Sequence, residues 1–242
     1  MQNQQIISGA ASGFRDYYGK IAEQRNELLQ LISKIYVKYG YERLETPCIE
    51  RLSTLRGKGG EESERLIYEV MDTTNESKLG LRFDLTIPLA RYITQNKGNI
   101  SYPFKRFAYG DVFRGESPQM QKGRLRGFIQ CDADCVGLFG TLVDAEVLEL
   151  MRDIFSELQV KVNIRINNRN ILDAFIEYCN ITDESQKSKF LNIIDSLEKD
   201  GVDKSRKFVS ELFGDEVLIA FDKFLKISEL QTNNEILFGL NE

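Results

Sequence analysis

Four polar side chains share one side of a predicted strand at residues 125–137, where they could bind a small charged ligand. Arg126, Gln130, Asp132 and Asp134 share one parity, which Phe128 and Val136 interrupt, and the side chains of a strand alternate between its two faces. The other parity carries small or apolar residues, namely Leu125, Ile129, Cys131, Ala133 and Cys135. Burying a guanidinium, an amide and two carboxylates side by side is unfavourable unless a ligand or mutual pairing satisfies them. We therefore expect this face to form the floor of a pocket.

A second strand-like run, residues 104–113, precedes this segment and ends at Arg114. The stretch between the two runs, GESPQMQKGR, contains a proline and two glycines, so the pattern predicts a hairpin. Arg114 and Glu116 stand at the entrance of its loop and Arg124 at the exit. A third run, residues 81–85, repeats the alternation: Leu81, Phe83 and Leu85 alternate with Arg82, Asp84 and Thr86. The three runs would present their polar faces together.

The basic charge gathers around the predicted hairpin. Residues 101–130 carry six Lys/Arg against two Asp/Glu, whereas residues 131–242 carry twelve against twenty-two. Such a local excess of cations favours a polyphosphate or a nucleic-acid end as the ligand. The alternative is a solvated hairpin edge that its charges keep soluble.

Composition indicates a folded protein and limits the chemistry. The 242 residues are 42% hydrophobic and 29% charged, enough for a sizeable core. We expect a cytoplasmic protein without a membrane segment, because no apolar run approaches roughly 18 residues and the N-terminus lacks the features of a signal peptide. The four cysteines show no metal-ligand spacing and the chain contains no histidine, so we expect no metal site and no histidine-based triad.

Periodicity predicts an α+β domain followed by a helical one. Helices are predicted at residues 16–39, 88–95, 141–158 and repeatedly from 168 to 240, and further strands at 41–49 and 160–166. Pro47 suits an edge or an interface. We place a domain boundary near residue 167, after an antiparallel sheet flanked by helices. The glycine-rich loop at residues 56–64 lacks the closing Gly-Lys-Ser/Thr of a phosphate-binding P-loop, so we do not assign that motif.

Four sequence blocks in order resemble histidyl-tRNA synthetase, a class II aminoacyl-tRNA synthetase. They are Gly13-Phe14-Arg15-Asp16, TPCIE at 46–50, LRFDLTIPLAR at 81–91 and FRGESPQMQKGRLRGFIQCDADCVG at 113–137. The resemblance implies a class II catalytic core at residues 1–167 and a helical insertion domain at 168–242. It is strongest from 41 to 137.

The resemblance also implies roles for the basic hairpin. The family makes histidyl-adenylate from ATP and histidine and then transfers the histidyl group to tRNA. Arg114 matches the catalytic arginine on the α-phosphate, Arg124 the loop arginine near the γ-phosphate, and Glu116 the residue that receives the adenine amino group. The transition state at phosphorus is strongly anionic and needs fixed cations more than a protein nucleophile. Mg²⁺ is expected with ATP.

On the amino-acid side, Asp84, Thr86 and Gln130 match residues that hold the α-ammonium, and Asp134 matches the acid that binds the imidazole. A buried acceptor opposite a ring N–H is a strong selector, because an analogue without the donor leaves it unpaired. The alternative for Gln130 and Asp134 is a surface strand that pairs with Arg126.

The family's first motif and its insertion imply partners. Pro47 and Glu50 match the motif at the dimer interface, so a homodimer is implied. The helical segment is similar to an insertion that can contact the tRNA acceptor stem. Its acidic balance gives that contact no electrostatic support, because binding to phosphates depends on Lys and Arg.

Some features depart from the family pattern. Leu125, Gly127 and Ser117 stand where the family usually has an aromatic residue, Glu or Gln, and Arg or Asn. The second histidine-recognition block and the third motif, with their arginines, should follow residue 242. We therefore expect this chain to be part of a complete synthetase. The alternatives are a catalytically inactive paralogue and the histidine-sensing regulatory subunit of ATP phosphoribosyltransferase.

Overall fold

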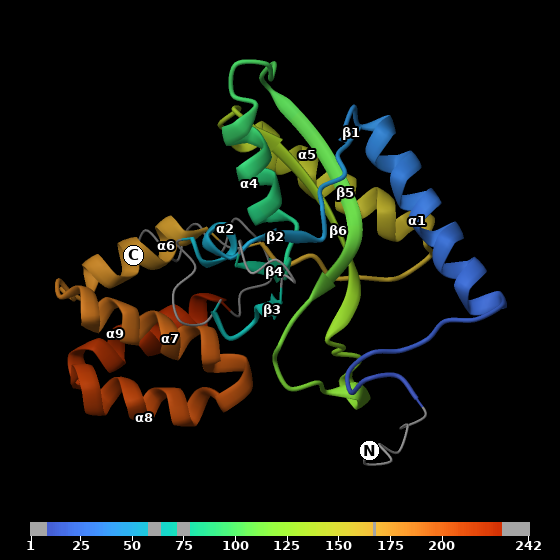
Figure 1. Ribbon diagram of the computed structural model, residues 1–242. Coiled ribbons are helices and arrows are strands. Elements are labelled where there is room, and N and C mark those ends of the chain that lie inside the picture. Colours follow the sequence, from blue (N-terminus) through green and yellow to red (C-terminus); the bar gives the residue numbers. More distant parts are fainter. Residues whose placement is uncertain (1–8, 58–63, 72–77, 167, 229–242) are drawn as a thin grey trace, which may run out of the picture. The chain divides into compact units, whose positions relative to one another are not determined.

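The computed structural model describes residues 9–57, 64–71, 78–166 and 168–228, and the chain divides into two compact units (Figure 1). The first unit is Met1–Asn163 and the second is Ile164–Glu242. The division therefore lies four residues before the boundary that the sequence suggested.

A long antiparallel hairpin forms the centre of the first unit. Strands β5 (Phe104–Phe113) and β6 (Gly127–Val136) pair along their whole length, from Phe104 opposite Val136 to Phe113 opposite Gly127. This confirms the hairpin predicted from the two alternating runs and the polar loop between them. Strand β1 (Glu42–Arg43) joins β5 in the parallel direction, so this sheet is mixed and not purely antiparallel.

Two amphipathic helices cover one face of the hairpin. Helices α1 (Lys20–Lys38) and α5 (Thr141–Glu157) lie beside β5 and β6 in Figure 1. Their contact with the sheet is an apolar cluster built on Tyr36, Tyr41, Phe107 and Leu150. Helix α1 begins four residues after the predicted start and ends at Lys38, one residue before the predicted end. Gly40 takes the predicted C′ position: its φ of 78° suits a glycine, and its N–H donates to the carbonyl of Val37. The opposite face of the hairpin is therefore left for the polar side chains.

The predicted strand at residues 41–49 is two short strands in two different sheets. Strand β1 pairs with β5, whereas β2 (Ile49–Arg51) pairs with β4 (Leu79–Leu81) in a sheet of order β2-β4-β3 that includes β3 (Tyr68–Val70). Pro47 lies between them, and proline has no N–H to continue a ladder. Helix α2 (Leu52–Arg56) follows β2 directly.

The predicted strand at residues 81–85 was wrong beyond Leu81. The backbone of Arg82 connects the two sheets instead: its N–H donates to Cys48 O at 2.9 Å, and its carbonyl accepts from Phe113 N at 2.9 Å. The chain then enters α4 (Thr86–Gln95), two residues before the predicted start at Pro88. The segment before α4 thus runs along β5, from Phe113, which bonds Arg82, to Arg106, which bonds Leu85.

A buried arginine fixes this crossing. The side chain of Arg82 is 5% exposed, and its guanidinium donates to Asp111 O at 2.8 Å and to Thr46 O at 2.7 Å. It lies over Gly110, where an added Cβ would collide with the guanidinium. A glycine on β5 therefore makes room for the arginine that holds the loop.

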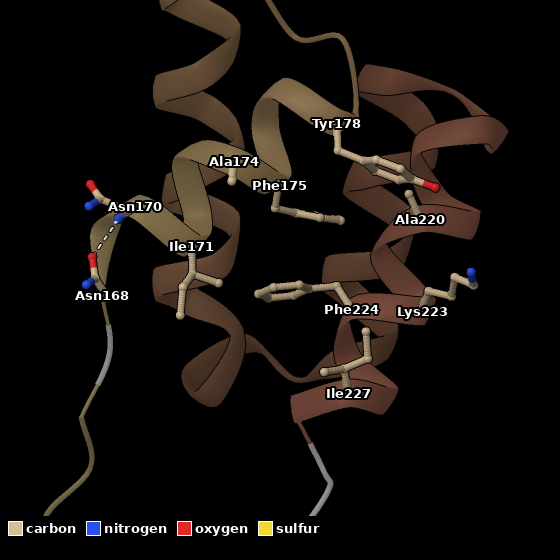
Figure 2. A pocket seen from close by; sticks show the side chains of 10 residues that line it. All are labelled: Asn168, Asn170, Ile171, Ala174, Phe175, Tyr178, Ala220, Lys223, Phe224 and Ile227. Carbon is tan, nitrogen blue, oxygen red and sulfur yellow. Dashed lines mark hydrogen bonds between the residues drawn. The ribbon is translucent and has the colours of Figure 1, made fainter. Parts of the chain in front are cut away.

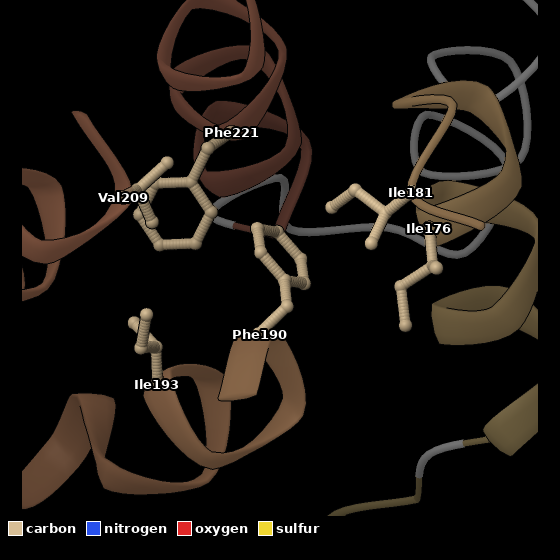
Figure 3. Packing of buried hydrophobic residues seen from close by; sticks show 6 residues of the cluster. All are labelled: Ile176, Ile181, Phe190, Ile193, Val209 and Phe221. Carbon is tan, nitrogen blue, oxygen red and sulfur yellow. The ribbon is translucent and has the colours of Figure 1, made fainter. Parts of the chain in front are cut away.

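The second unit is a helical bundle with an apolar core. Its helices are α6 (Arg169–Tyr178), α7 (Glu184–Asp200), α8 (Val202–Phe213) and α9 (Asp215–Ser228). Figure 3 shows Phe190 of α7 at the centre of the packing, and its ring meets those of Phe213 and Phe221 edge to face. The core comprises Ile176, Ile181, Phe190, Ile193, Val209 and Phe221. The helices predicted here are confirmed up to residue 228, and the rest of the predicted stretch lies outside the described residues.

The strand predicted at residues 160–166 was wrong. Its described residues form no strand, and Val160, Val162 and Ile166 are exposed. Alternation alone does not make a strand, because the backbone also needs a neighbouring strand for its hydrogen bonds. Most of the glycine-rich loop at 56–64 lies outside the described residues. None of the described helices is long and apolar enough to span a bilayer.

Candidate functional site

The polar face of the hairpin forms as the alternation predicted. In the register of β5 and β6, Gln130 lies opposite Gly110, Asp132 opposite Ala108, and Asp134 opposite Arg106. Side chains directly opposite each other in antiparallel strands lie on the same face. Gln130, Asp132 and Asp134 therefore share a face, and Arg106 of β5 lies among them.

Arg106 is the charged partner of this face. It is 1% exposed, its Nη2 lies 2.6 Å from Asp134 Oδ2 and 3.9 Å from Asp132 Oδ2, and the same nitrogen donates to Leu85 O at 3.4 Å. The alternative pairing of Asp134 with Arg126 is wrong. Arg126 immediately precedes the first residue of β6, and its Nε donates instead to a backbone carbonyl, Glu116 O, at 2.9 Å.

Burial changes the acidity of the site. The pKa of the Asp134 carboxyl is raised mainly by burial, and the nearby Arg106 guanidinium limits that rise. Burial also raises the pKa of Asp84, and the charge on Asp132 adds to the rise while Arg114 opposes it. The charges of Asp84, Asp132, Asp134, Arg106 and Arg114 thus act on one another across the same region.

Gln130 is held by one end of its amide. Its Nε2 donates to both carboxylate oxygens of Asp132, at 2.9 and 3.1 Å. Its Oε1 is buried and has no hydrogen-bond partner among the described residues. The same holds for Nε and Nη1 of Arg106 and for Oδ2 of Asp134, whose contact with Arg106 is an ion pair. Buried polar atoms without partners are rare in native proteins, so these atoms indicate a place for a ligand or ordered water.

Asp84 and Thr86 lie at the start of α4. Asp84 Oδ1 accepts a hydrogen bond from Ile87 N at 3.0 Å, which satisfies one of the free N–H groups of the first turn. Thr86 is the first residue of the helix and is exposed. The helix start therefore fixes the loop that carries both predicted ammonium-binding residues.

Arg114 follows the last residue of β5 and is half-buried. Its Nε donates to Phe83 O at 3.2 Å, and its guanidinium lies 5.1 Å from the centre of the Phe128 ring. These two contacts hold the guanidinium beside the loop of Asp84. A cation held in a fixed position is suited to stabilising an anionic ligand bound there.

Glu116 and Arg124 lie on the loop between β5 and β6, and both side chains are exposed. The loop contains a short 3₁₀ turn, Met120–Lys122, and closes through paired backbone hydrogen bonds between Gln119 and Arg124 at 3.0 and 3.2 Å. Among the described residues, no side-chain contact connects Glu116 or Arg124 to the Asp84–Asp134 group. The structure therefore brings together the predicted amino-acid site and Arg114, but not the two loop residues.

Pro47 and Glu50, the residues predicted at a dimer interface, differ in exposure. Pro47 is exposed, whereas Glu50 is 6% exposed and accepts hydrogen bonds from Nε and Nη2 of Arg91 at 2.9 and 2.8 Å. Glu50 thus has a partner within its own chain, in α4. Its part in an interface stays a prediction.

Sequence reasoning missed the roles of Arg106 and Asp132. Arg106 follows the parity of Ala108, Gly110 and Val112 in a run that otherwise looked apolar. Its position opposite Asp134 depends on the register of the hairpin, and the long loop does not determine that register from sequence. Two charged residues of matching parity in adjacent strands were the signal that could have identified the pair.

Outside the polar face, the described residues form no second reaction centre. Across the described ranges, no cluster of three or more His, Cys, Asp or Glu side chains is arranged to hold a metal ion. The helical unit contains a pocket of about 460 Å³ between α6 and α9, where Phe175 and Phe224 stack with ring centres 4.5 Å apart (Figure 2). Its lining is mostly apolar and aromatic; Asn168, Asn170 and Lys223 add polar groups, and none of its lining residues carries a carboxylate.

Comparison with known proteins identifies the family. A family model described as histidyl-tRNA synthetase matches residues 13–235. The histidine–tRNA ligase of Azobacteroides pseudotrichonymphae genomovar. CFP2 is 36% identical over 213 residues, which are 79% of this chain and 46% of that protein. The crystal structure of histidyl-tRNA synthetase from Nostoc sp. PCC 7120 superposes with a TM-score of 0.82 at 30% identity, covering 96% of this chain and 51% of that one.

A further neighbour shares the fold alone. It is an ATP phosphoribosyltransferase regulatory subunit/histidyl-tRNA synthetase from Bacillus halodurans C, with a TM-score of 0.67 at 17% identity, covering 98% of this chain and 56% of that one. The chain spans about half the length of the relatives it matches. The predicted α+β fold of class II synthetases is confirmed, because the family model and the close structural match cover nearly all of the chain. The chain belongs to the histidyl-tRNA synthetase family.

Proposed function

We propose that this chain is the histidine- and ATP-binding part of a histidine–tRNA ligase. The whole protein would activate histidine with ATP to histidyl-adenylate and transfer the histidyl group to tRNA. The observation that carries the proposal is the gathering of Asp84, Gln130, Asp134 and Arg114 around one face of the hairpin. Residues 1–167 would be the catalytic core and residues 168–242 the insertion domain.

The amino-acid end of the proposed site consists of acceptors. Histidine carries an α-ammonium and an imidazole N–H, both hydrogen-bond donors at neutral pH. Asp84, Thr86 and the unpartnered Oε1 of Gln130 would receive the ammonium, and Asp134 would receive the ring N–H. An amino acid without the ring donor would leave the half-buried Asp134 carboxylate without that hydrogen bond, which supports selectivity for histidine.

The nucleotide end of the proposed site is cationic. Arg114, fixed by Phe83 O and the Phe128 ring, would stabilise the charge that develops on the α-phosphate when the histidine carboxylate attacks it and pyrophosphate leaves. Glu116 would receive the adenine amino group and Arg124 would bind near the γ-phosphate. Both are exposed on the loop, so we propose that ATP orders them. Mg²⁺ would enter with the triphosphate.

The partners of the whole protein are part of the proposal. A homodimer would form around the segment of Pro47 and Glu50, and histidine-accepting tRNA would approach the assembled site in the cytoplasm. Residues 164–242 carry ten Lys/Arg against fifteen Asp/Glu, so this unit has little electrostatic attraction for the tRNA backbone. Basic residues near the hairpin loop are the better candidates for contact with the acceptor end.

Calorimetric titration of histidine tests the amino-acid site. We expect Asp134→Ala to lower histidine affinity about 10- to 100-fold, because a hydrogen bond to a charged group contributes roughly 1.5–3 kcal/mol. Asp144→Ala, which removes an exposed carboxylate of α5 in the same unit, is the matched control and should bind histidine like the unchanged chain. Equal affinity in the two variants would contradict the proposed site.

Titration of ATP tests the nucleotide site. Arg114→Ala should lower ATP affinity by a similar factor, whereas Arg152→Ala, an exposed arginine of α5, should leave it unchanged. Histidine binding without ATP binding would favour the regulatory-subunit alternative. A folded chain that binds neither ligand would contradict the assignment of a binding function to this part of the protein.

A further inference from the structure

The polar face of the hairpin carries a buried arginine and an aspartate to which the proposed function gives no role. Arg106 is almost completely buried, and Asp132 lies beside it on β6. Neither is among the residues proposed to contact histidine or ATP. A buried guanidinium is unfavourable unless its partners compensate it, so its presence needs a reason other than stability.

We infer that Arg106 and Asp132 are positioning residues that make both histidine-binding groups of the hairpin into hydrogen-bond acceptors. Arg106 holds Asp134 in place as a carboxylate, and Asp132 turns the amide of Gln130 so that its oxygen is left for the ligand. The inference rests on the proposed function, because it explains how that site selects a ligand with two donors.

The contacts of Arg106 fix Asp134 in both position and charge. Arg106 Nη2 forms an ion pair with Asp134 Oδ2 at 2.6 Å, and it donates a hydrogen bond to Leu85 O at 3.4 Å. Leu85 lies between Asp84 and Thr86, so one guanidinium connects the imidazole end of the site to the loop that holds the ammonium end. A carboxylate at this position accepts a ring N–H, whereas a protonated carboxyl group is also a donor.

The contact of Asp132 fixes the amide of Gln130. Carboxylate oxygens only accept, so the two bonds at 2.9 and 3.1 Å require the Nε2 end of Gln130 to face Asp132. The Oε1 end then points away and is buried without a partner among the described residues. If residue 132 were a donor, the amide would turn and present its NH₂ group to the ligand.

Several groups set the charge of Asp134, and their balance predicts how pH acts. Arg106 lowers its pKa, while burial and Asp132 raise it. Tyr36 and Tyr41, whose rings pack against the other face of the sheet, interact with Asp134 electrostatically and have raised pKa values. Both tyrosines are therefore neutral near pH 7. Arg106 is the cation that opposes these influences and favours the ionised form of Asp134.

The first test measures Asp134 itself and needs no ligand. The ¹³C signal of its carboxyl group, identified by its loss in Asp134→Asn, is followed against pH in the unchanged chain and in Arg106→Met. We expect the titration midpoint to move to higher pH in Arg106→Met and to stay in Lys105→Met. Lys105 is the adjacent residue of β5, and its ion pair with Glu146 at 2.8 Å lies on the opposite face. An unmoved midpoint in Arg106→Met overturns the inference, whether or not histidine binds.

The second test measures histidine affinity between about pH 7 and pH 8.5, where the imidazole of free histidine is mostly neutral. In Arg106→Met the affinity should fall about 10- to 100-fold, the range seen when residues that orient a binding group are removed, and should recover as pH rises. Lys105→Met should match the unchanged chain. A loss of affinity that does not vary with pH would assign Arg106 a merely structural role and overturn the inference.

Two further variants test the inference if Arg106→Met does not fold. Arg106→Lys retains the cation and should keep Asp134 ionised, with affinity within about tenfold of the unchanged chain. Asp132→Leu keeps the approximate size but removes both acceptor oxygens that hold the amide of Gln130, so we expect it to lower histidine affinity without moving ATP affinity. An Asp132→Leu chain with unchanged histidine affinity contradicts the inference for Gln130. Absence of histidine binding in the unchanged chain is a different result, because it overturns the proposed function first.

Discussion

The two units bury different kinds of residue. The sheet unit encloses Glu50, Arg82 and Arg106 with exposures of 6%, 5% and 1%, whereas Ser205 is the only buried polar residue found among the described residues of the helical unit. The serine hydroxyl donates to a carbonyl of its own helix, Gly201 O at 3.0 Å. Buried charge lowers stability unless it is paired, so the sheet unit depends on specific polar partners where the helical unit depends almost wholly on apolar packing.

The largest change in stability is expected from removing the central aromatic ring of the helical unit. Phe190 is fully buried, so Phe190→Ala should destabilise this unit by about 3–5 kcal/mol through lost burial and the cavity left behind. Hydrogen exchange would show faster opening of α7, α8 and α9 while the amides of β5 and β6 keep their protection. Ile219→Ala, on an exposed position of α9, is the control. Equal loss of protection in both units would mean that they unfold together.

Replacing a buried arginine of the sheet unit should lower the free energy of unfolding by a comparable but smaller amount. Arg82→Met would leave the carbonyls of Asp111 and Thr46 without their donor, and we expect a loss of about 3 kcal/mol in the free energy of unfolding. Arg43→Met, which removes an exposed arginine, should change it by less than about 0.5 kcal/mol. Denaturant titration measures both. Similar values would show that the buried hydrogen bonds of Arg82 do not hold the crossing between the sheets.

Replacing Asp84 should raise the stability of the folded chain and lower its affinity for histidine. Its pKa is raised in the folded chain, so its ionised form disfavours folding once the pH rises through that pKa. Asp84→Asn should therefore be more stable than the unchanged chain at pH 7, by about 1 kcal/mol. The difference should shrink as the pH falls below the folded pKa, because both side chains are then neutral.

Unfolding titrations from about pH 4 to pH 7 follow this difference, and histidine affinity should fall in the same variant. An Asn variant less stable than the unchanged chain at pH 7 would show that the charge on Asp84 supports the fold. Its hydrogen bond to Ile87 N can persist in the variant, since an asparagine oxygen also accepts.

The buried serine of the helical unit gives the smallest expected change. Ser205→Ala removes a bond within one helix turn, and alanine has the higher helix propensity, so stability should change by less than about 0.5 kcal/mol. Thermal unfolding is sufficient to measure it. A loss several times larger would mean that this unit, too, depends on a buried polar contact.

The errors of the sequence interpretation have a common cause. Residues 160–166 alternate as a strand does, yet the described part of the chain supplies no partner strand for them. Residues 82–85 also alternate, but Arg82 turns across to β5 and is held there by backbone carbonyls far away in sequence. Both outcomes depend on what the rest of the fold places beside the segment, and a local pattern does not contain that information.

The sequence by itself determined which residues share a face. A strand has a period of two residues, so the spacing of Gln130, Asp132 and Asp134 was enough to place them together on β6. It also determined the hairpin, the helical half and, through four ordered blocks, the family. These features depend on local spacing or on residue types that follow one another in the chain.

Only the tertiary structure decided what those residues contact. The register of the hairpin placed Arg106 opposite Asp134, and the packing of α1 and α5 on the other face left the polar face as the place where these charges meet. The crossing at Arg82 then brought Asp84 to the same region. Electrostatic energy depends on distance and burial, and both are properties of the folded chain that sequence order does not contain.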